Sequence, residues 1–273
     1  MQFFLIRELT NDSIIKRIFN VIEVKQNEIL LNCRINKGNL NFKIKIIKKI
    51  IKILNEYKCK NIILSKNLKQ DEIIINLFLE YNIQIINGHK LFENSLEIIL
   101  EKVIRDNNIK QENSQISIIS NNLNDKLESL IKKIAIKFKT INIVTNNIMI
   151  FEKIEKTLFE KDGTVILISN NKKKSLNRSN IIVNMELNEE QINKFSIYEK
   201  SIIINFNKNI KIHKKRFNGK VINSFEIKLK KNSKIYRELS IKKYSYYDII
   251  DLAEVYINNY KDEIRNICIN SLK

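Results

Sequence analysis

The stretch SQISIISNNLNDKLESLIKKIAIKFKTINIVTNN, residues 114–147, decides the fold of this chain. Its segments 116–120 and 141–145 are short and mostly apolar, which is typical of β-strands buried on both faces. The segment between them carries one apolar stripe at helical spacing, made by Leu123, Leu127, Leu130, Ile131, Ile134 and Phe138. Apolar strands that alternate with such helices predict a parallel sheet covered by helices on both faces.

The same alternation extends along the chain in both directions. After residue 147 we expect helices at 148–161 and 188–195, and strands at 164–168, 180–184, 201–206 and 221–229. Before residue 114 we expect strands at 2–7, 61–65 and 83–86, helices at 41–57, 70–81 and 89–105, and a β-hairpin of residues 18–24 and 28–35. A long helix over about 246–270 closes the chain, because Ser245 and Asp248 give it a capping-box-like start.

The polar segment 106–114 separates two alternating series and is the expected domain boundary. We therefore predict an α/β protein of two α/β domains. The first domain, 1–110, contains the hairpin. The second domain, 114–273, is a Rossmann-like parallel sheet with helices on both faces, followed by a basic segment and the long C-terminal helix. A chain of 273 residues is long enough for both domains.

The composition excludes several classes of protein. With no proline and four glycines, the chain is neither collagen-like nor a Pro/Gly-rich linker. No apolar run approaches the roughly 18 residues that span a bilayer, and the N-terminus lacks a signal-peptide cleavage site, so we expect a cytoplasmic protein with no membrane partner. Cys33, Cys59 and Cys268 are far apart and form no CxxC pair, which argues against a disulfide framework or a metal site.

The net charge of +19 has two explanations that the sequence leaves open. Ile, Lys and Asn dominate the composition, as AT-rich coding produces, so that many lysines would lie on a solvated basic face. The charge is nevertheless uneven, because residues 206–243 hold 13 lysines and arginines against two glutamates, a net of +11. Nucleic acid is therefore a candidate partner.

Two basic clusters are the candidate polyanion-binding residues. The first cluster lies in a predicted loop and comprises Lys172, Lys173, Lys174 and Arg178. The second cluster precedes an Asn218-Gly219 turn and comprises Lys214, Lys215 and Arg216. Phe217 follows the second cluster and could stack on a base. No helix-turn-helix, RRM or zinc-finger pattern accompanies them.

A dinucleotide in the second domain would bind at the loop that follows its first strand, residues 120–125. NAD(P) is therefore the cofactor to consider, but its phosphates require glycines in this loop, and none lies between Gly88 and Gly163. The candidate cofactor-binding residues lie at the ends of three strands; they are Ser120, Asn121, Asn122, Thr145, Asn146 and Asn184.

Residues 114–206 resemble the NAD(P)-binding half of shikimate dehydrogenases and glutamyl-tRNA reductases. The resemblance rests on the order of strands and helices and on the segments 141–147, 163–165, 179–185 and 201–204. In that group an aspartate, three aliphatic residues, an asparagine and a small residue close the fourth strand beside the nicotinamide. Asn184 matches the asparagine, whereas Asn180 replaces the aspartate and Met185 the small residue.

The catalytic half of that group is not matched. Shikimate dehydrogenases use a lysine and an aspartate, with the lysine in an Asn-x-Thr-x-Pro-His-Lys motif, and this chain has no proline. Lys66 followed by Asp71 is the nearest analogue, and its spacing differs. We therefore expect no catalytic residues, and a non-catalytic or regulatory Rossmann-like protein descended from a dehydrogenase-like ancestor, with an unidentified small molecule or protein as its partner.

Two alternatives remain open. One is an active NAD(P)-dependent oxidoreductase with an unconventional phosphate loop, and the other is a nucleic-acid-associated basic protein. In the leading hypothesis a ligand crevice lies between the two domains. Gly88 and His89 would line it from the first domain, because they stand where a strand end meets a helix N-terminus. No companion residue near His89 indicates a metal.

Overall fold

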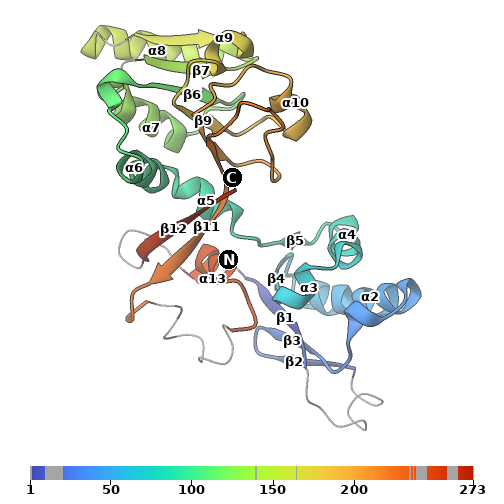
Figure 1. The fold of residues 1–273 in the computed structure, drawn as a ribbon. Coiled ribbons are helices and arrows are strands. Elements are labelled where there is room, and N and C mark those ends of the chain that lie inside the picture. The colour runs from blue at the N-terminus through green and yellow to red at the C-terminus, as the bar shows by residue number, and fades with distance from the viewer. Residues whose placement is uncertain are drawn as a thin grey trace. The chain divides into compact units, whose positions relative to one another are not determined.

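A computed structural model of the chain describes residues 2–9, 21–138, 140–163, 165–233, 235, 237, 245–256 and 264–272 (Figure 1). Contacts within the chain divide it into two units. Unit 1 comprises Met1–Leu91 and Ile227–Asn266, and unit 2 comprises Phe92–Glu226 and Ile267–Lys273. Both units contain a mainly parallel sheet accompanied by helices, which confirms the predicted α/β class.

The sheet of unit 1 has the strand order β2-β3-β1-β4-β5. Its strands are β1 (Phe4–Glu8), β2 (Ile22–Lys25), β3 (Glu28–Leu31), β4 (Asn61–Leu64) and β5 (Gln84–Ile85). β1 pairs in parallel with β3 and β4, and β4 pairs in parallel with β5. β2 is antiparallel to β3, which confirms the hairpin over residues 22–31, and Gln26 in its turn has a φ of 52°. Residues 18–20 of the predicted first strand lie outside the described residues.

The helices of unit 1 are α2 (Leu40–Glu56), α3 (Lys66–Lys69), α4 (Glu72–Glu80), the first residues of α5 (His89–Asn94), and α13 (Ile249–Tyr256), with a 3-10 turn η1 (Ile35–Lys37). α2 begins at an N-cap, Asn39, whose side chain accepts a hydrogen bond from the backbone of Phe42. The apolar face of α2 and the buried side chains of α4 pack with Phe4 and Ile6 of β1 to form the core of this unit.

The seven-stranded sheet has the order β12-β11-β10-β9-β6-β7-β8. Six of its strands are parallel: β6 (Gln115–Ile119), β7 (Thr140–Val144), β8 (Ile166–Ser169), β9 (Ile181–Asn184), β10 (Ile202–Asn205) and β11 (Lys220–Leu229). Numbered along the chain, these six strands lie in the order 3-2-1-4-5-6, which is the order of a Rossmann sheet. The strand order therefore makes unit 2 Rossmann-like.

The helices of unit 2 are α6 (Leu96–Asp106), α7 (Asp125–Ala135), α8 (Ile148–Asp162), α9 (Lys172–Leu176) and α10 (Glu189–Asn193), with a 3-10 turn η2 (Gln111–Asn113). α7 buries the predicted stripe through Leu127, Leu130, Ile131 and Ile134. Side chains that follow β8 and β9, among them Leu176, Leu187 and Ile192, pack on the sheet in one core cluster with Ile119, Val144, Ile182 and Ile203.

The prediction of a long C-terminal helix is wrong. α13 is described only to Tyr256, residues 257–263 lie outside the described part of the chain, and Ile264–Leu272 is a strand, β12, beside β11. Isoleucines, which are β-branched, favour a strand wherever a sheet edge is free to pair. The buried Ile267 shows that this pairing takes apolar surface out of water.

Two further predictions of local structure need correction. The predicted helix 89–105 is two helices, α5 and α6, because the chain bends at Ser95, whose backbone N–H donates to the carbonyl of Phe92. Residues 172–176, predicted as a loop, form α9, whose N-cap Asn171 accepts a hydrogen bond from Lys174 N–H.

The division between the units also differs in position from the predicted boundary at 106–114. The contacts within the chain place the division after Leu91. The ring of Phe92 packs against Phe206 and Phe225 of unit 2, with ring centroids 4.3 and 5.0 Å away, so Phe92 belongs to unit 2. Residues 227–266 group with unit 1. None of the described helices has the length and apolar character needed to cross a membrane.

Candidate functional site

The carboxyl ends of β6, β7 and β9 bring the predicted cofactor-binding residues together. β6 lies between β7 and β9, and the chain leaves it toward β7 on one side and later returns to β9 on the other. This is the switch point of the sheet, where open α/β sheets bind their ligands. Ser120, Thr145 and Met185 directly follow the three strands, so the prediction of a site at this edge is consistent with the topology.

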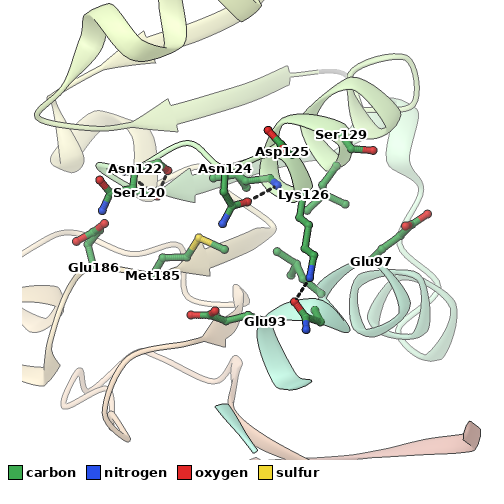
Figure 2. Close-up of a pocket in the computed structure, with 14 residues that line it drawn as sticks. Glu93, Glu97, Ser120, Asn122, Asn124, Asp125, Lys126, Ser129, Met185 and Glu186 are labelled. Carbon is green, nitrogen blue, oxygen red and sulfur yellow. Dashed lines mark hydrogen bonds between the residues drawn. The ribbon is translucent and has the colours of Figure 1, made fainter. Parts of the chain in front are cut away.

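The loop between β6 and α7 is held by asparagine and serine side chains. The Ser120 hydroxyl donates to the carbonyl of Asn122 at 2.7 Å. Asn124 is the N-cap of α7 and accepts from the backbone N–H of Leu127 at 2.8 Å (Figure 2). The Oδ1 atom of Asn121 accepts the backbone N–H of Asn146 at 2.8 Å, which joins this loop to the end of β7.

Glu186 faces this loop from the turn after β9. Its Oε1 atom accepts the backbone N–H of Asn121 at 2.9 Å. In Rossmann sheets, backbone N–H groups of this loop bind the pyrophosphate of a dinucleotide. Here a carboxylate of the protein takes that donor, and a diphosphate in the same place would meet its negative charge. The residues present therefore do not fit an NAD(P) pyrophosphate.

Asn184 is engaged within the fold. It is fully buried at the end of β9, and its Nδ2 group donates to the Leu187 carbonyl at 2.7 Å and to Asn205 Oδ1 at 2.8 Å. Its Oδ1 atom accepts the Leu187 N–H at 2.9 Å. These bonds fix the turn that contains Met185 and Glu186. The residue that matches the asparagine of the shikimate dehydrogenase group thus positions Glu186.

A pocket of about 550 Å³, named here the acidic pocket, opens on one side of Glu186 (Figure 2). It is lined by Glu93, Asn94, Leu96, Glu97, Ser120, Asn122, Asn124, Asp125, Lys126, Leu127, Ser129, Leu130, Met185 and Glu186. Four of these residues carry carboxylates against one lysine, which gives the lining a formal charge of −3. The Lys126 ammonium donates to the side chain of Asn94, so its charge is held at the wall.

A second pocket of about 290 Å³, named here the lysine pocket, also has Glu186 in its lining. Its other residues are Ile119, Asn121, Val144, Asn146, Lys172, Leu187, Gln191, Lys194 and Phe195. Two lysines and one carboxylate give a formal charge of +1. Glu186, Lys194 and Phe195 were not predicted as site residues, since they become neighbours only when the turns after β8 and β9 are folded.

Gly88 and His89 belong to unit 1, whereas the pockets lie in unit 2. Gly88 has a φ of 76°, and a Cβ atom there would lie 2.6 Å from the side chain of Ile250. The backbone N–H of His89 donates to Asn87 Oδ1 at 3.1 Å. This turn packs against α13 within unit 1, so the crevice predicted between the domains stays a prediction. Within the described part of the chain, no three His, Cys, Asp or Glu side chains are placed to hold a metal ion.

The nearest analogue of a catalytic lysine and aspartate does not form a pair. Asp71 is the N-cap of α4 and accepts the backbone N–H groups of Ile73 and Ile74 at 3.1 and 3.3 Å. Although desolvation opposes it, the hydrogen bond from Lys43 and these N–H groups lower the pKa of Asp71. Lys66 is exposed. Asp71 thus stabilises the start of a helix.

A different lysine binds two aspartates in unit 1. Lys69 Nζ lies 2.6 Å from Asp251 Oδ2 and 2.7 Å from Asp248 Oδ2. Burial raises the pKa of Asp251 to about 6, although Lys69 opposes this shift. Burial works against the charge of Lys69, but the two carboxylates raise its pKa overall, so Lys69 stays protonated and has no lone pair to accept a proton. The sequence did not predict this cluster, since 182 residues separate Lys69 from Asp251.

The first basic cluster lies on and after α9. Lys172 turns toward the lysine pocket, donating to Asn146 Oδ1 at 3.1 Å, with its Nζ atom 6.0 Å from the centre of the Phe195 ring. Lys173, Lys174 and Arg178 are exposed. Only Lys172 therefore contributes to a pocket wall, and the other three form an open basic surface.

In the second cluster, Lys214 donates to the carbonyl of Asn193 at 3.1 Å, at the C-terminal end of α10, while Lys215 and Arg216 are exposed. Phe217 is partly buried and packs against the core cluster of unit 2, so only part of its ring is exposed, and stacking on a base stays a prediction. Of the basic segment 206–243, residues 234, 236 and 238–243, including Lys234, Lys242 and Lys243, lie outside the described residues.

His213 also belongs to the basic segment, and it pairs with an acid. Its Nε2 atom lies 2.8 Å from Glu189 Oε1, and this hydrogen bond lowers the pKa of Glu189. Both side chains are exposed, so this hydrogen bond is a surface contact between the loop that contains His213 and helix α10.

No family model matches the chain, and no curated protein matches it. Solved structures with partial likeness include L-tryptophan dehydrogenase from Nostoc punctiforme (9% identity, TM-score 0.31, 77% of this chain and 63% of that one). The A chain of dipicolinate synthase from Bacillus subtilis is similar at 11% identity and a TM-score of 0.31, over 53% of this chain and 48% of that one. A putative aspartate carbamoyltransferase from Trypanosoma cruzi is similar at 13% identity and a TM-score of 0.27, over 77% of this chain and 71% of that one.

The match spans less than two thirds of the tryptophan dehydrogenase, and TM-scores near 0.3 carry no argument about activity. The strand order of unit 2 is the firmer observation. The chain is thus an α/β protein with a Rossmann-like second unit.

Proposed function

We propose that the chain is a non-catalytic, Rossmann-like ligand-binding protein, whose ligand is a small molecule other than a dinucleotide. The observation that carries this proposal is the hydrogen bond from Asn121 N–H to the carboxylate of Glu186 at 2.9 Å. It lies at the switch point, where the ligand of such a sheet is expected. Pockets of about 550 and 290 Å³ at this edge offer room for a ligand.

The charge around Glu186 supports the exclusion of a dinucleotide. Two unit charges 4 Å apart near a protein surface interact by roughly 4 kcal/mol, which is about a thousandfold in affinity. A diphosphate at the Asn121 amide would meet Glu186 in this range of distance, and Asp125 also lines the acidic pocket. The loop has neither glycine nor a free cation to offset that repulsion.

The candidate acid–base groups support a non-catalytic role. Asp71 caps a helix, and the ammonium of Lys69 is held by two carboxylates. His213 is exposed and pairs with Glu189 on the surface. A general base must lie within hydrogen-bond reach of the proton that it removes, and none of these three side chains lines either pocket at the carboxyl edge.

Titration of NADPH, followed by its fluorescence, tests the proposal. We expect no saturable binding to the wild-type protein, and a measurable gain in Glu186→Gln, which removes the charge and keeps a hydrogen-bond acceptor. Glu160→Gln is the matched control, because Glu160 is exposed on α8, pairs with Lys156 and lines neither pocket. Micromolar binding of NADPH by the wild type, or NADP-dependent oxidation of shikimate-like substrates, would show that the protein is an oxidoreductase instead.

Binding of nucleic acid is the second candidate, supported by the exposed basic surface of Lys173, Lys174 and Arg178. A gel-shift titration with duplex and single-stranded DNA and RNA at low and moderate salt separates it from the first. Since phosphate contacts give strongly salt-dependent affinity, a nucleic-acid-binding protein would shift at low salt and lose most of that affinity at moderate salt. Absence of a shift at low salt removes this candidate.

A further inference from the structure

We propose that the lysine pocket binds a planar aromatic group that carries one negatively charged substituent, such as a carboxylate or a phosphate. This inference rests on the proposed function, because it names the class of ligand for the same edge of the sheet. Four features of the pocket carry it: its size, its apolar floor, the half-buried ring of Phe195, and the position of Lys172.

The floor and size of the pocket fit a flat apolar group. Ile119 and Val144 end the strands β6 and β7, and Leu187 lies in the turn after β9; all three are buried. Phe195 is half-buried and presents part of its ring to the same space. Aromatic rings prefer to pack against such apolar and aromatic walls. A volume of about 290 Å³ lies at the small end for ligand pockets and suits a single ring system.

Lys172 gives the pocket a cation at its polar rim. Its Nζ atom donates to Asn146 Oδ1 at 3.1 Å and lies 6.0 Å from the centre of the Phe195 ring. An ammonium has three N–H donors. Within the described part of the chain, Lys172 has no ion pair with a carboxylate. Its further donors can therefore bind an anionic group on a ligand whose ring packs beside Phe195.

The balance of charge limits that ligand to one anionic group. Lys172 and Lys194 oppose Glu186, which leaves a formal charge of +1 in the lining. Lys194 is exposed and pairs with Glu190 at 2.6 Å, so Lys172 is the main site of attraction. A second phosphate extending toward the Asn121 amide would approach Glu186. The polar side chains of Asn121, Asn146 and Gln191 can bind the remaining polar atoms of the ligand.

Calorimetric titration with 4-hydroxybenzoate and with AMP tests the inference and distinguishes a carboxylate from a phosphate ligand. We expect at least one of them to bind with a Kd below about 1 mM, and Lys172→Gln to weaken it by about tenfold or more. Lys173→Gln is the matched control, since this lysine is one residue away on α9 but exposed and outside the lining. Equal weakening by both variants would show that the ligand responds to the general positive charge of this surface and not to a defined site, which would contradict the inference.

Phe195→Leu tests the aromatic contact, with a thermal melt to confirm that the variant is folded. Loss of the ring should weaken the binding of each aromatic probe that the wild type binds, and it should leave the binding of inorganic phosphate unchanged. If neither aromatic probe binds to the wild type, or if the folded Phe195→Leu protein binds them as well as the wild type, the inference is overturned. Those results leave the exclusion of dinucleotides intact, whereas tight NADPH binding by the wild type contradicts the proposed function itself.

Discussion

The two pockets at the carboxyl edge of unit 2 share one side chain and have opposite charge. The acidic pocket has a formal charge of −3, and the lysine pocket has a formal charge of +1. Glu186 lines both, and its carboxylate is bound to the amide of Asn121. A dinucleotide needs a continuous path along such an edge, with donors for its phosphates in the middle. Here the middle holds a carboxylate, so the edge has two separate pockets of different charge.

This difference depends on a buried asparagine. Asn184 donates to the Leu187 carbonyl and to Asn205, and it accepts the N–H of Leu187, which fixes the turn that carries Glu186. We expect Asn184→Ala to lower the free energy of unfolding by roughly 3 kcal/mol, because it leaves several buried polar groups without partners. Urea unfolding measures this loss. Asn177→Ala, at an exposed position at the end of α9, should change it by less than about 0.5 kcal/mol.

A change in unit 1 should affect stability without changing either pocket. The pKa of Asp251 is raised by burial to about 6, above its ordinary value of 3.8, so the folded state holds this proton more tightly than the unfolded state. The contribution of Asp251 is therefore most favourable below about pH 4 and falls by roughly 3 kcal/mol as the pH rises through 6.

Asp251→Asn removes this titration, and we expect the unfolding free energy of the variant to lack that decline between about pH 4 and pH 6. Asp248→Asn is the control, because Asp248 is more exposed and leaves Asp251 in place. Both variants should bind lysine-pocket ligands as the wild type does. A change in ligand affinity would show that residues of unit 1 influence the pockets of unit 2.

The shared carboxylate can be neutralised to change both pockets together. Glu186→Gln makes the formal charges of the linings −2 and +2. We expect inorganic pyrophosphate to bind the variant about tenfold more tightly than the wild type, since part of the repulsion at the Asn121 amide is removed. Calorimetry provides the measurement, with Glu160→Gln as control. Unchanged affinity would mean that Glu186 is not what excludes phosphates.

The smallest effect is expected where only the acidic pocket changes. Asp125 lies in the first turn of α7 and lines the acidic pocket but not the lysine pocket. Asp125→Asn should therefore change the affinity of a lysine-pocket ligand by less than about twofold, because charges separated by solvent are screened. A larger change would show that the two pockets act as one site.

Much of the fold could be predicted from the sequence because its strands and helices differ clearly in apolar pattern. The strands of residues 116–119 and 141–144 are buried along their length, and α7 buries the predicted stripe. The prediction failed at Ile264–Leu272, where pairing with β11 outweighs a weak helical pattern. The prediction also missed α9, because its five residues are too few to show the apolar periodicity of a helix.

The candidate site was predictable only in part, for a similar reason. Ser120, Asn121 and Asn146 follow strands, and the rule for parallel sheets brings strand ends together. Glu186 and Phe195 could not be recognised, because their neighbours come from distant turns and no motif marks them. The missing glycines already counted against a dinucleotide in the sequence, and the carboxylate that faces the Asn121 amide is a further observation behind the proposal that none binds.

The most direct test of this account is the amide resonance of Asn121 during a titration with NADP+. The hydrogen bond to Glu186 is the central observation, and NMR reports on that N–H group itself. We expect its chemical shift to stay constant up to about 1 mM NADP+ in the wild type, and to move in Glu186→Gln. A saturable shift of the wild-type resonance at micromolar NADP+ would contradict the account.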